Sequence, residues 1–168
     1  LSLRGKCRYC KKPISVQYPI VEALMAMVFI VSYLAWPIDL ISDAGVYSLV
    51  SWLIISVGLM ALAVYDFKWM VLPDKIVLPL AVLAVVLRLG YITLYESDIK
   101  WALVQWALAV VVASGIFYIL ILVSDGKWIG GGDVTLGLVT GTVLADPLLA
   151  FGMIFTASLL GLIFSLPA

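Results

Sequence analysis

The sequence contains no histidine and only two cysteines among its 168 residues. The lack of histidine excludes, within this chain, a histidine-based metal site and any Ser-His or Cys-His nucleophile system. Charged residues are scarce as well, at 12% of the chain, whereas about a quarter is usual in soluble domains. Ten basic residues balance ten acidic ones, so no excess of positive charge points to a nucleic-acid partner.

Apolar residues are abundant instead. They form 65% of the sequence, and the mean hydropathy is +1.20. A transmembrane helix needs about 20 consecutive apolar residues. Six apolar runs are present, of which four or five are long enough to qualify, at about 20–36, 46–65, 75–91, 101–123, 134–145 and 148–166. The sequence therefore predicts an all-α, polytopic membrane protein, a helical bundle of about six transmembrane helices in a lipid bilayer.

Basic residues are divided unevenly between the two sides that such helices define. If residues 1–18 lie on one side, eight of the ten Lys and Arg residues share it, and only Arg88 and Lys100 lie opposite. Basic residues accumulate in cytoplasmic loops, so we expect the N-terminal segment in the cytoplasm. Asp66 and Asp133 then both lie at cytoplasmic helix ends.

These two aspartates are the candidate catalytic residues. An ionisable side chain at membrane depth is costly and indicates function, although Asp133 could instead cap a helix that begins at Val134, and Asp66 could be a loop residue. Gly130 and Gly132 precede Asp133. Glycines lack a Cβ and would let a substrate backbone approach the carboxylate, which favours the functional interpretation.

Two carboxylates suffice for peptide hydrolysis by water, without a covalent intermediate. The ionised member takes a proton from water and the protonated member donates one to the carbonyl oxygen, the pair sharing one proton. We expect Asp133 to be the ionised member, because it begins a helix, and Asp66 the protonated one, because it ends a helix.

The run at 134–145 is short for a membrane span. Its twelve residues would rise about 18 Å, against a hydrocarbon core of about 30 Å. Either the helix extends into its polar neighbours or Asp133 lies below the membrane surface. Gly137 and Gly141 form a Gly-x-x-x-Gly face that allows close helix packing, so we expect this helix inside the bundle.

Other charged residues lie beside the candidate pair. Asp74 follows Pro73 and is predicted to cap the next helix, with a secondary role near the active site as the alternative. Lys68 is two residues from Asp66 and is interpreted as an orientation charge, with a local electrostatic role as the alternative. Both could lie where substrate approaches.

Cys7 and Cys10 form a Cys-x-x-Cys pair in the basic N-terminal segment. In a cytoplasmic setting such a pair is typical of half a zinc site, and the alternative is two free thiols. We therefore assign residues 1–18 to the end of a zinc-binding domain and residues 19–168 to a membrane domain. The chain opens with Leu1 rather than Met and stops just after an apolar run, so we expect it to be a fragment lacking both ends.

Three stretches together resemble the type IV prepilin peptidases, membrane aspartic peptidases that process type IV pilins and type II secretion pseudopilins. They are Cys7–Glu22, Asp66 through Pro73-Asp74, and Gly130-x-Gly132-Asp133. The resemblance implies that Asp66 and Asp133 are catalytic, in a bacterial inner membrane with the active site facing the cytoplasm. The implied substrate is a prepilin or pseudopilin whose basic leader is removed.

The resemblance also implies activities beyond cleavage. Many members methylate the new N-terminus with S-adenosylmethionine, and the Cys pair would belong to a structural zinc site. The sequence departs from the family pattern in lacking the first Cys pair and in carrying Gln17 where a basic residue is expected. These departures bear on methylation and zinc more than on the peptidase.

Two other classes of protein remain open. A presenilin-like or signal-peptide-peptidase-like protease would also use Tyr65-Asp66 and Gly130-x-Gly132-Asp133, with Pro167-Ala168 as the start of a third motif. A non-enzymatic cation carrier would bind its ion between the two aspartates. Carrier sites lie near the bilayer midplane, which fits two carboxylates at helix ends poorly.

Overall fold

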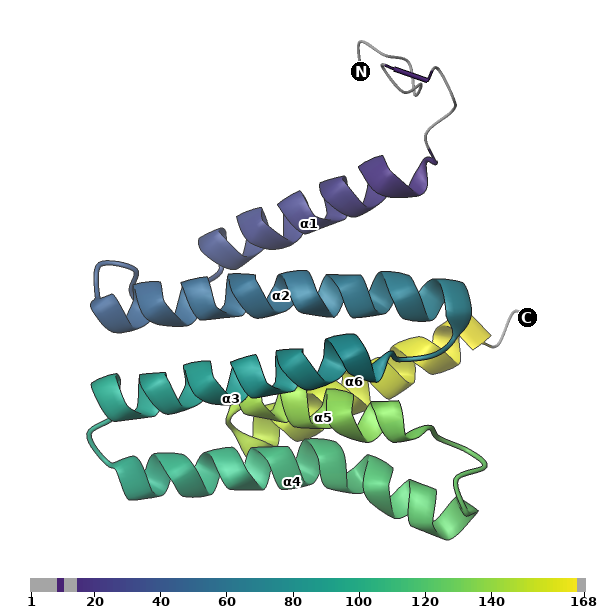
Figure 1. Cartoon of the computed structure of the whole chain (residues 1–168). Coiled ribbons are helices and arrows are strands. Elements are labelled where there is room, and N and C mark those ends of the chain that lie inside the picture. The colour runs from purple at the N-terminus through teal and green to yellow at the C-terminus, as the bar shows by residue number, and fades with distance from the viewer. Residues whose placement is uncertain (1–8, 11–14, 166–168) are drawn as a thin grey trace.

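The computed structural model describes residues 9–10 and 15–165. Within these ranges the chain is a bundle of six helices, which confirms the predicted all-α class (Figure 1). They are α1 (Gln17–Leu34), α2 (Asp43–Trp69), α3 (Asp74–Tyr95), α4 (Ile99–Ser124), α5 (Gly131–Leu144) and α6 (Pro147–Ser165). Helices α1 to α4 lie side by side in alternating directions, α5 packs between α3 and α4, and α6 packs against α4.

Helix length divides the described helices into two groups. Helices α1 to α4 are long and apolar enough to cross a membrane, whereas α5 and the described part of α6 are shorter apolar helices. The predicted number of helices is therefore confirmed, but four of the six have the length of a span. Helix α5 has 14 residues and rises about 21 Å, which is less than a hydrocarbon core of about 30 Å.

The buried core lies where α2, α3 and α5 meet. Ile55 and Leu62 of α2 pack with Val77 and Leu80 of α3 and with Val139 of α5. A second cluster joins Ala109 and Ala113 of α4 to Ala150 of α6. Burying this apolar surface among small and branched side chains fixes how the helices pack around α5.

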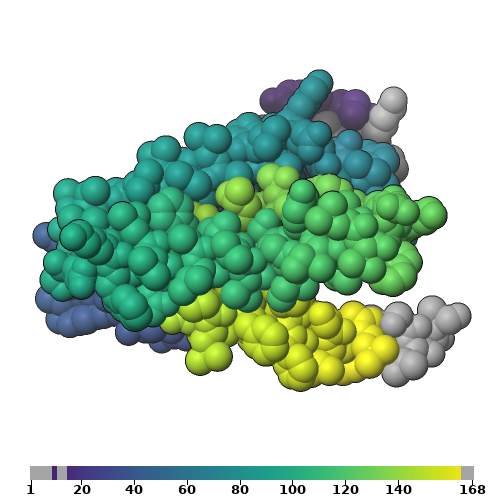
Figure 2. Space-filling view, turned by 90° about the horizontal axis from the view of Figure 1, so that it is seen from below, coloured from purple at the N-terminus to yellow at the C-terminus, as the bar shows by residue number. Residues whose placement is uncertain are grey.

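Helix α5 is enclosed by its neighbours, as predicted from its glycines. A Cβ added to Gly141 would lie 2.8 Å from the carbonyl oxygen of Ala109, and one added to Gly137 would lie 2.5 Å from that of Ala113. Only glycine allows α4 to approach this closely. Seen from the α4 side, α4 and α3 cover most of α5 (Figure 2).

Helix boundaries are set by capping residues. Asp98 accepts a hydrogen bond from the Trp101 N–H and caps α4, and Asp146 accepts from Leu148 and Leu149 at the start of α6. Met70 ends α2 in the left-handed conformation, at φ 51°, and turns the chain toward α3.

Candidate active site

Asp66 and Asp133 lie at the same end of the bundle. Asp66 is in the last turn of α2, which ends at Trp69, and Asp133 is in the first turn of α5, which begins at Gly131. The C-terminus of α2 and the N-terminus of α5 lie at the same end of the bundle (Figure 1). Two carboxylates separated by 67 positions in the sequence therefore share one face of the molecule.

A close packing contact joins the two segments. Leu72, in the loop between α2 and α3, lies against Gly132, where an added Cβ would be 2.8 Å from the leucine Cβ. The charge of Asp66 acts on Asp133, so the two carboxylates are close enough to interact electrostatically. The structure thus brings together both predicted catalytic residues and Gly132.

The environments of the two carboxylates differ. The Asp66 side chain is exposed, whereas Asp133 is partly buried. Asp133 lies outside the four helices that are long enough to cross a membrane. Burial raises the pKa of Asp133 above its ordinary value, a hydrogen bond to the Gly130 backbone works against the rise, and the charge of Asp66 adds to it. The raised pKa of Asp133 is opposite to the expectation that the helix N-terminus keeps this carboxyl ionised. The loss of solvation outweighs the effect of the helix end.

The glycines before Asp133 have two different roles. Gly130 is the N-cap of α5, and Gly130 and Gly131 have open space where a Cβ would point. Gly132 instead accommodates Leu72. Substrate backbone could therefore approach along Gly130 and Gly131, whereas Gly132 is needed for packing.

Two capping assignments made from the sequence are wrong. Asp133 is the third residue of α5, which begins at Gly131, so it does not cap a helix starting at Val134. Asp74 is the first residue of α3, and Pro73 occupies the N-cap position. Proline fits the N-cap position because its fixed φ suits the approach to a helix. The acidic Asp74 in the first turn interacts favourably with the helix dipole.

An aromatic stack beside Asp66 was missed from the sequence. The rings of Tyr65 and Trp69 lie 4.3 Å apart, and the Lys68 ammonium lies 4.3 Å from the Trp69 ring centroid. Lys68 therefore contacts an aromatic face, and no ion pair is formed by it in the part of the chain that the structure describes. The i, i+4 spacing of Tyr65 and Trp69 is the signal that could have predicted the stack.

The structure describes only one of the two cysteines that were predicted to bind zinc. Cys10 is an exposed free cysteine, and Cys7 lies outside the described residues. Among residues 9–10 and 15–165, no group of three or more His, Cys, Asp or Glu side chains could hold a metal ion. The described residues alone therefore do not fit a closed zinc site, which needs four ligands.

The fold and site define a helical membrane protein with two interacting carboxylates at one end of its bundle. Residues 53–166 match the model of the "Type IV leader peptidase family", and residues 1–36 match that of the "Bacterial Peptidase A24 N-terminal domain". The chain belongs to the type IV leader peptidase family. No solved structure matches it significantly.

Curated relatives agree with this assignment. The prepilin leader peptidase/N-methyltransferase of Stutzerimonas stutzeri is 33% identical over 136 residues, covering 81% of this chain and 44% of the relative. The protein of the same name from Neisseria gonorrhoeae is 31% identical over 169 residues, covering 97% of this chain and 53% of the relative. This chain therefore spans about half the length of the curated relatives that it matches. The match favours the predicted family over the presenilin-like and carrier alternatives.

Proposed function

We propose that this chain is the membrane domain of an aspartic endopeptidase that removes the leader of type IV prepilins or prepilin-like proteins. The observation that carries the proposal is the placement of Asp66 and Asp133 at the same end of the bundle, on segments joined by the contact of Leu72 with Gly132. The names of the relatives support the substrate class, because they are prepilin leader peptidases.

The two aspartates divide the chemistry between them. We assign the proton-donating role to Asp133, because its carboxyl is partly buried and burial raises its pKa. Asp66 takes a proton from water as the water oxygen attacks the scissile carbonyl carbon, and Asp133 donates its proton to the carbonyl oxygen. The tetrahedral gem-diol then collapses: the C–N bond breaks, the leaving amine takes up the proton held by Asp66, and one hydroxyl of the gem-diol returns its proton to Asp133 as the new carboxyl group forms. No covalent enzyme intermediate is needed.

The site faces the cytoplasm in this proposal. Helices α1 to α4 alternate in direction, so Lys68, Lys75 and Lys127 lie at the same end as the aspartates and as the start of α1 (Figure 1). The positive-inside rule assigns that end to the cytoplasmic side of a bacterial inner membrane. A leader cut there would lie outside the bilayer, next to the hydrophobic helix of the pilin.

Methylation of the new N-terminus with S-adenosylmethionine, and a structural zinc ion, remain parts of the proposal for the full-length protein. The relatives' names include N-methyltransferase. The described residues provide one exposed cysteine toward zinc, so no step of the peptidase reaction is routed through either group.

Cleavage of a prepilin in membranes containing the full-length protein tests the proposal. Asp66→Asn and Asp133→Asn keep the size of each side chain and remove its titrating proton, so each alone should abolish cleavage while the protein remains inserted. Asp125→Asn is the matched control, because Asp125 is exposed at the C-terminus of α4 and asparagine tolerates its left-handed conformation. Normal cleavage by either of the first two variants would refute the catalytic pair. Mapping the cut site separates this enzyme from an intramembrane protease, which would cut within the bilayer.

A further inference from the structure

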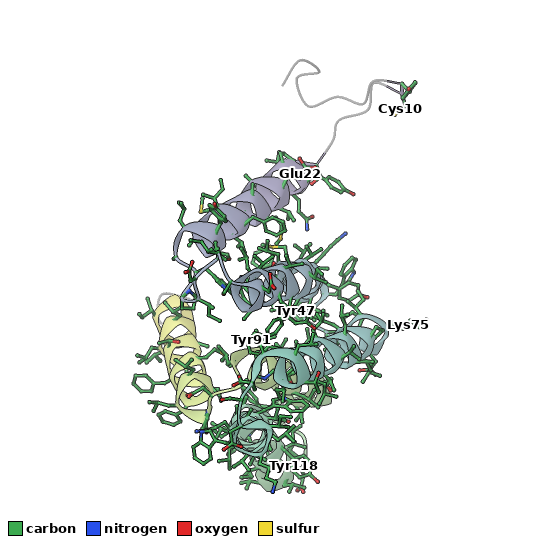
Figure 3. All side chains as sticks on the ribbon, turned by 90° about the vertical axis from the view of Figure 1, so that its left-hand side faces the viewer. Cys10, Glu22, Tyr47, Lys75, Tyr91 and Tyr118 are labelled. Atoms are coloured by element: carbon green, nitrogen blue, oxygen red, sulfur yellow. The ribbon has the colours of Figure 1, made fainter. Side chains whose placement is uncertain are left out.

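A pocket lies at the end of the bundle opposite the aspartates. Its volume is about 460 Å³, within the range of about 300–1,000 Å³ that is usual for ligand pockets. It is lined by the first half of α2, the second half of α3, the last residues of α5 and the loop between α1 and α2. Figure 3 views the molecule from this end, with Tyr47 and Tyr91 between α2 and α3.

The walls of this pocket are held in place by their own hydrogen bonds. Trp36 Nε1 donates to Ser48 Oγ at 3.1 Å, Trp52 Nε1 donates to Ser32 Oγ at 2.8 Å, and Tyr47 Oη donates to the Leu87 carbonyl at 3.1 Å. The rings of Tyr47 and Tyr91 are 6.1 Å apart. The aromatic walls are therefore pre-formed, and binding would require little reorganisation.

Polar groups in the pocket have unused hydrogen-bonding capacity. Thr142 is 1% exposed, and its hydroxyl is buried without a hydrogen-bond partner in the described structure. Arg88 Nε is likewise buried and unpartnered. Most buried polar groups are paired, so these two atoms are exceptions in the pocket wall. Both atoms are themselves buried, so a ligand in the pocket would contact the other guanidinium nitrogens of Arg88, whose side chain is 18% exposed.

The charges in the pocket define the ligand further. Arg88 and Glu96 are its charged lining residues, and their closest atoms are 3.9 Å apart, a loose ion pair. An ionisable residue inside a membrane-spanning helix such as α3 indicates function. One cation and one anion side by side complement a zwitterion, whereas a purely anionic ligand would be opposed by Glu96.

We propose that this pocket binds a phospholipid with a zwitterionic ethanolamine head group, from the leaflet opposite the aspartates. The phosphate accepts hydrogen bonds from Arg88, whose guanidinium suits phosphate oxygens, and the primary ammonium donates to Glu96. The aromatic rings favour the cationic end of the head group. Apolar side chains on the same wall, such as Leu87 and Val143, contact the acyl chains, which commits the site to a lipid rather than a soluble phosphate.

Native mass spectrometry of the full-length protein tests this proposal. Protein extracted in mild detergent from membranes containing phosphatidylethanolamine and phosphatidylglycerol should retain the ethanolamine lipid above its share of the membrane. Arg88→Gln should lower this occupancy at least about tenfold, because a buried charge partner is lost. Lys100→Gln is the matched control, since Lys100 is a basic residue of the same end that does not line the pocket, and it should retain the lipid.

A second variant keeps the test decisive if Arg88→Gln does not fold. Glu96 is partly exposed and immediately follows α3, so Glu96→Gln should fold and should lose the preference for phosphatidylethanolamine over phosphatidylglycerol. Three results would overturn the proposal: the wild-type protein retains no lipid, it retains lipids in their membrane proportions, or it retains more phosphatidylglycerol than ethanolamine lipid. Displacement of the lipid by soluble glycerophosphoethanolamine would also overturn it, because the acyl chains would then contribute nothing. Cleavage activity is not a readout, so this result is independent of the peptidase proposal.

Discussion

Leu72 packs against Gly132 so closely that a Cβ on the glycine would lie 2.8 Å from the leucine Cβ. The leucine belongs to the loop that follows Asp66, and the glycine directly precedes Asp133. This contact therefore connects the backbones that carry the two carboxylates. The distance between the Asp66 and Asp133 carboxylates therefore depends on Gly132. A Cβ added to Gly130 or Gly131 would meet nothing within 4 Å.

Gly132→Ala should impair cleavage because the new methyl group displaces Leu72 and with it the loop after Asp66. Misplacing a catalytic group by about 1 Å can cost about a hundredfold in rate, so a loss of about tenfold or more is expected. Gly152→Ala, in α6, is the control and should cleave normally, since its Cβ would point into open space. Initial rates of prepilin cleavage measure both.

A compensating variant checks the cause. Leu72→Ala in the Gly132→Ala background makes room for the added methyl group and should restore part of the lost rate. If Gly132→Ala cleaved at the wild-type rate, the contact would not set the geometry of the pair. If the double variant were no better than Gly132→Ala, another effect of the methyl group would be responsible.

The glycine face of α5 should be required for stability. A Cβ at Gly137 would meet the Ala113 carbonyl, so Gly137→Ala must push α4 and α5 apart. Overpacking of this kind costs roughly 1–3 kcal/mol. Gly152→Ala, in α6, meets nothing within 4 Å and should leave the protein as stable as the wild type or slightly more stable. Thermal unfolding in detergent compares the two, and equal midpoints would contradict the close packing.

Asp133→Asn should not destabilise the protein at neutral pH, although it abolishes cleavage. Burial raises the pKa of Asp133. A carboxyl whose pKa is higher in the folded than in the unfolded state binds its proton more tightly when folded. The charged form then lowers stability increasingly as the pH rises through the unfolded pKa of about 3.9, and the full penalty applies above the folded pKa. Asparagine carries no such penalty.

The midpoint of thermal unfolding of Asp133→Asn should therefore equal or exceed that of the wild type at about pH 7.5, and the difference should shrink toward about pH 4. A lower midpoint at neutral pH that recovers in acid would show that the carboxylate is stabilising, and would return the ionised role to Asp133. Circular dichroism of the detergent-solubilised protein at each pH measures this.

Much of the fold could be predicted from apolar runs alone, because a helix in a membrane must satisfy its own backbone hydrogen bonds. The start of α5 could not be predicted in this way. Three consecutive glycines indicate a turn, yet the helix begins at Gly131, and the third glycine, Gly132, packs against Leu72. Local propensity was overridden there by a tertiary contact.

The candidate pair could be predicted because each aspartate lies in a recognisable segment next to an apolar run. Its electrostatics could not, since the burial of Asp133 depends on how α5 packs against other helices. The pocket at the opposite end was missed for the same reason. Arg88 was placed only on the side opposite the aspartates, whereas it lies inside α3, pairs with the C-cap Glu96 of the same helix and lines a pocket to which α2 and α5 also contribute.

The most direct test of the catalytic pair is the rate of prepilin cleavage by Asp66→Asn, Asp133→Asn and the double variant in single-turnover experiments with the full-length protein. Groups that act as one unit are not additive, so removing the second should add little once the first is gone. We predict that all three variants share the same residual rate, while Asp125→Asn keeps the wild-type rate. Losses that multiply in the double variant, or a single variant that cleaves normally, would show that Asp66 and Asp133 do not work together.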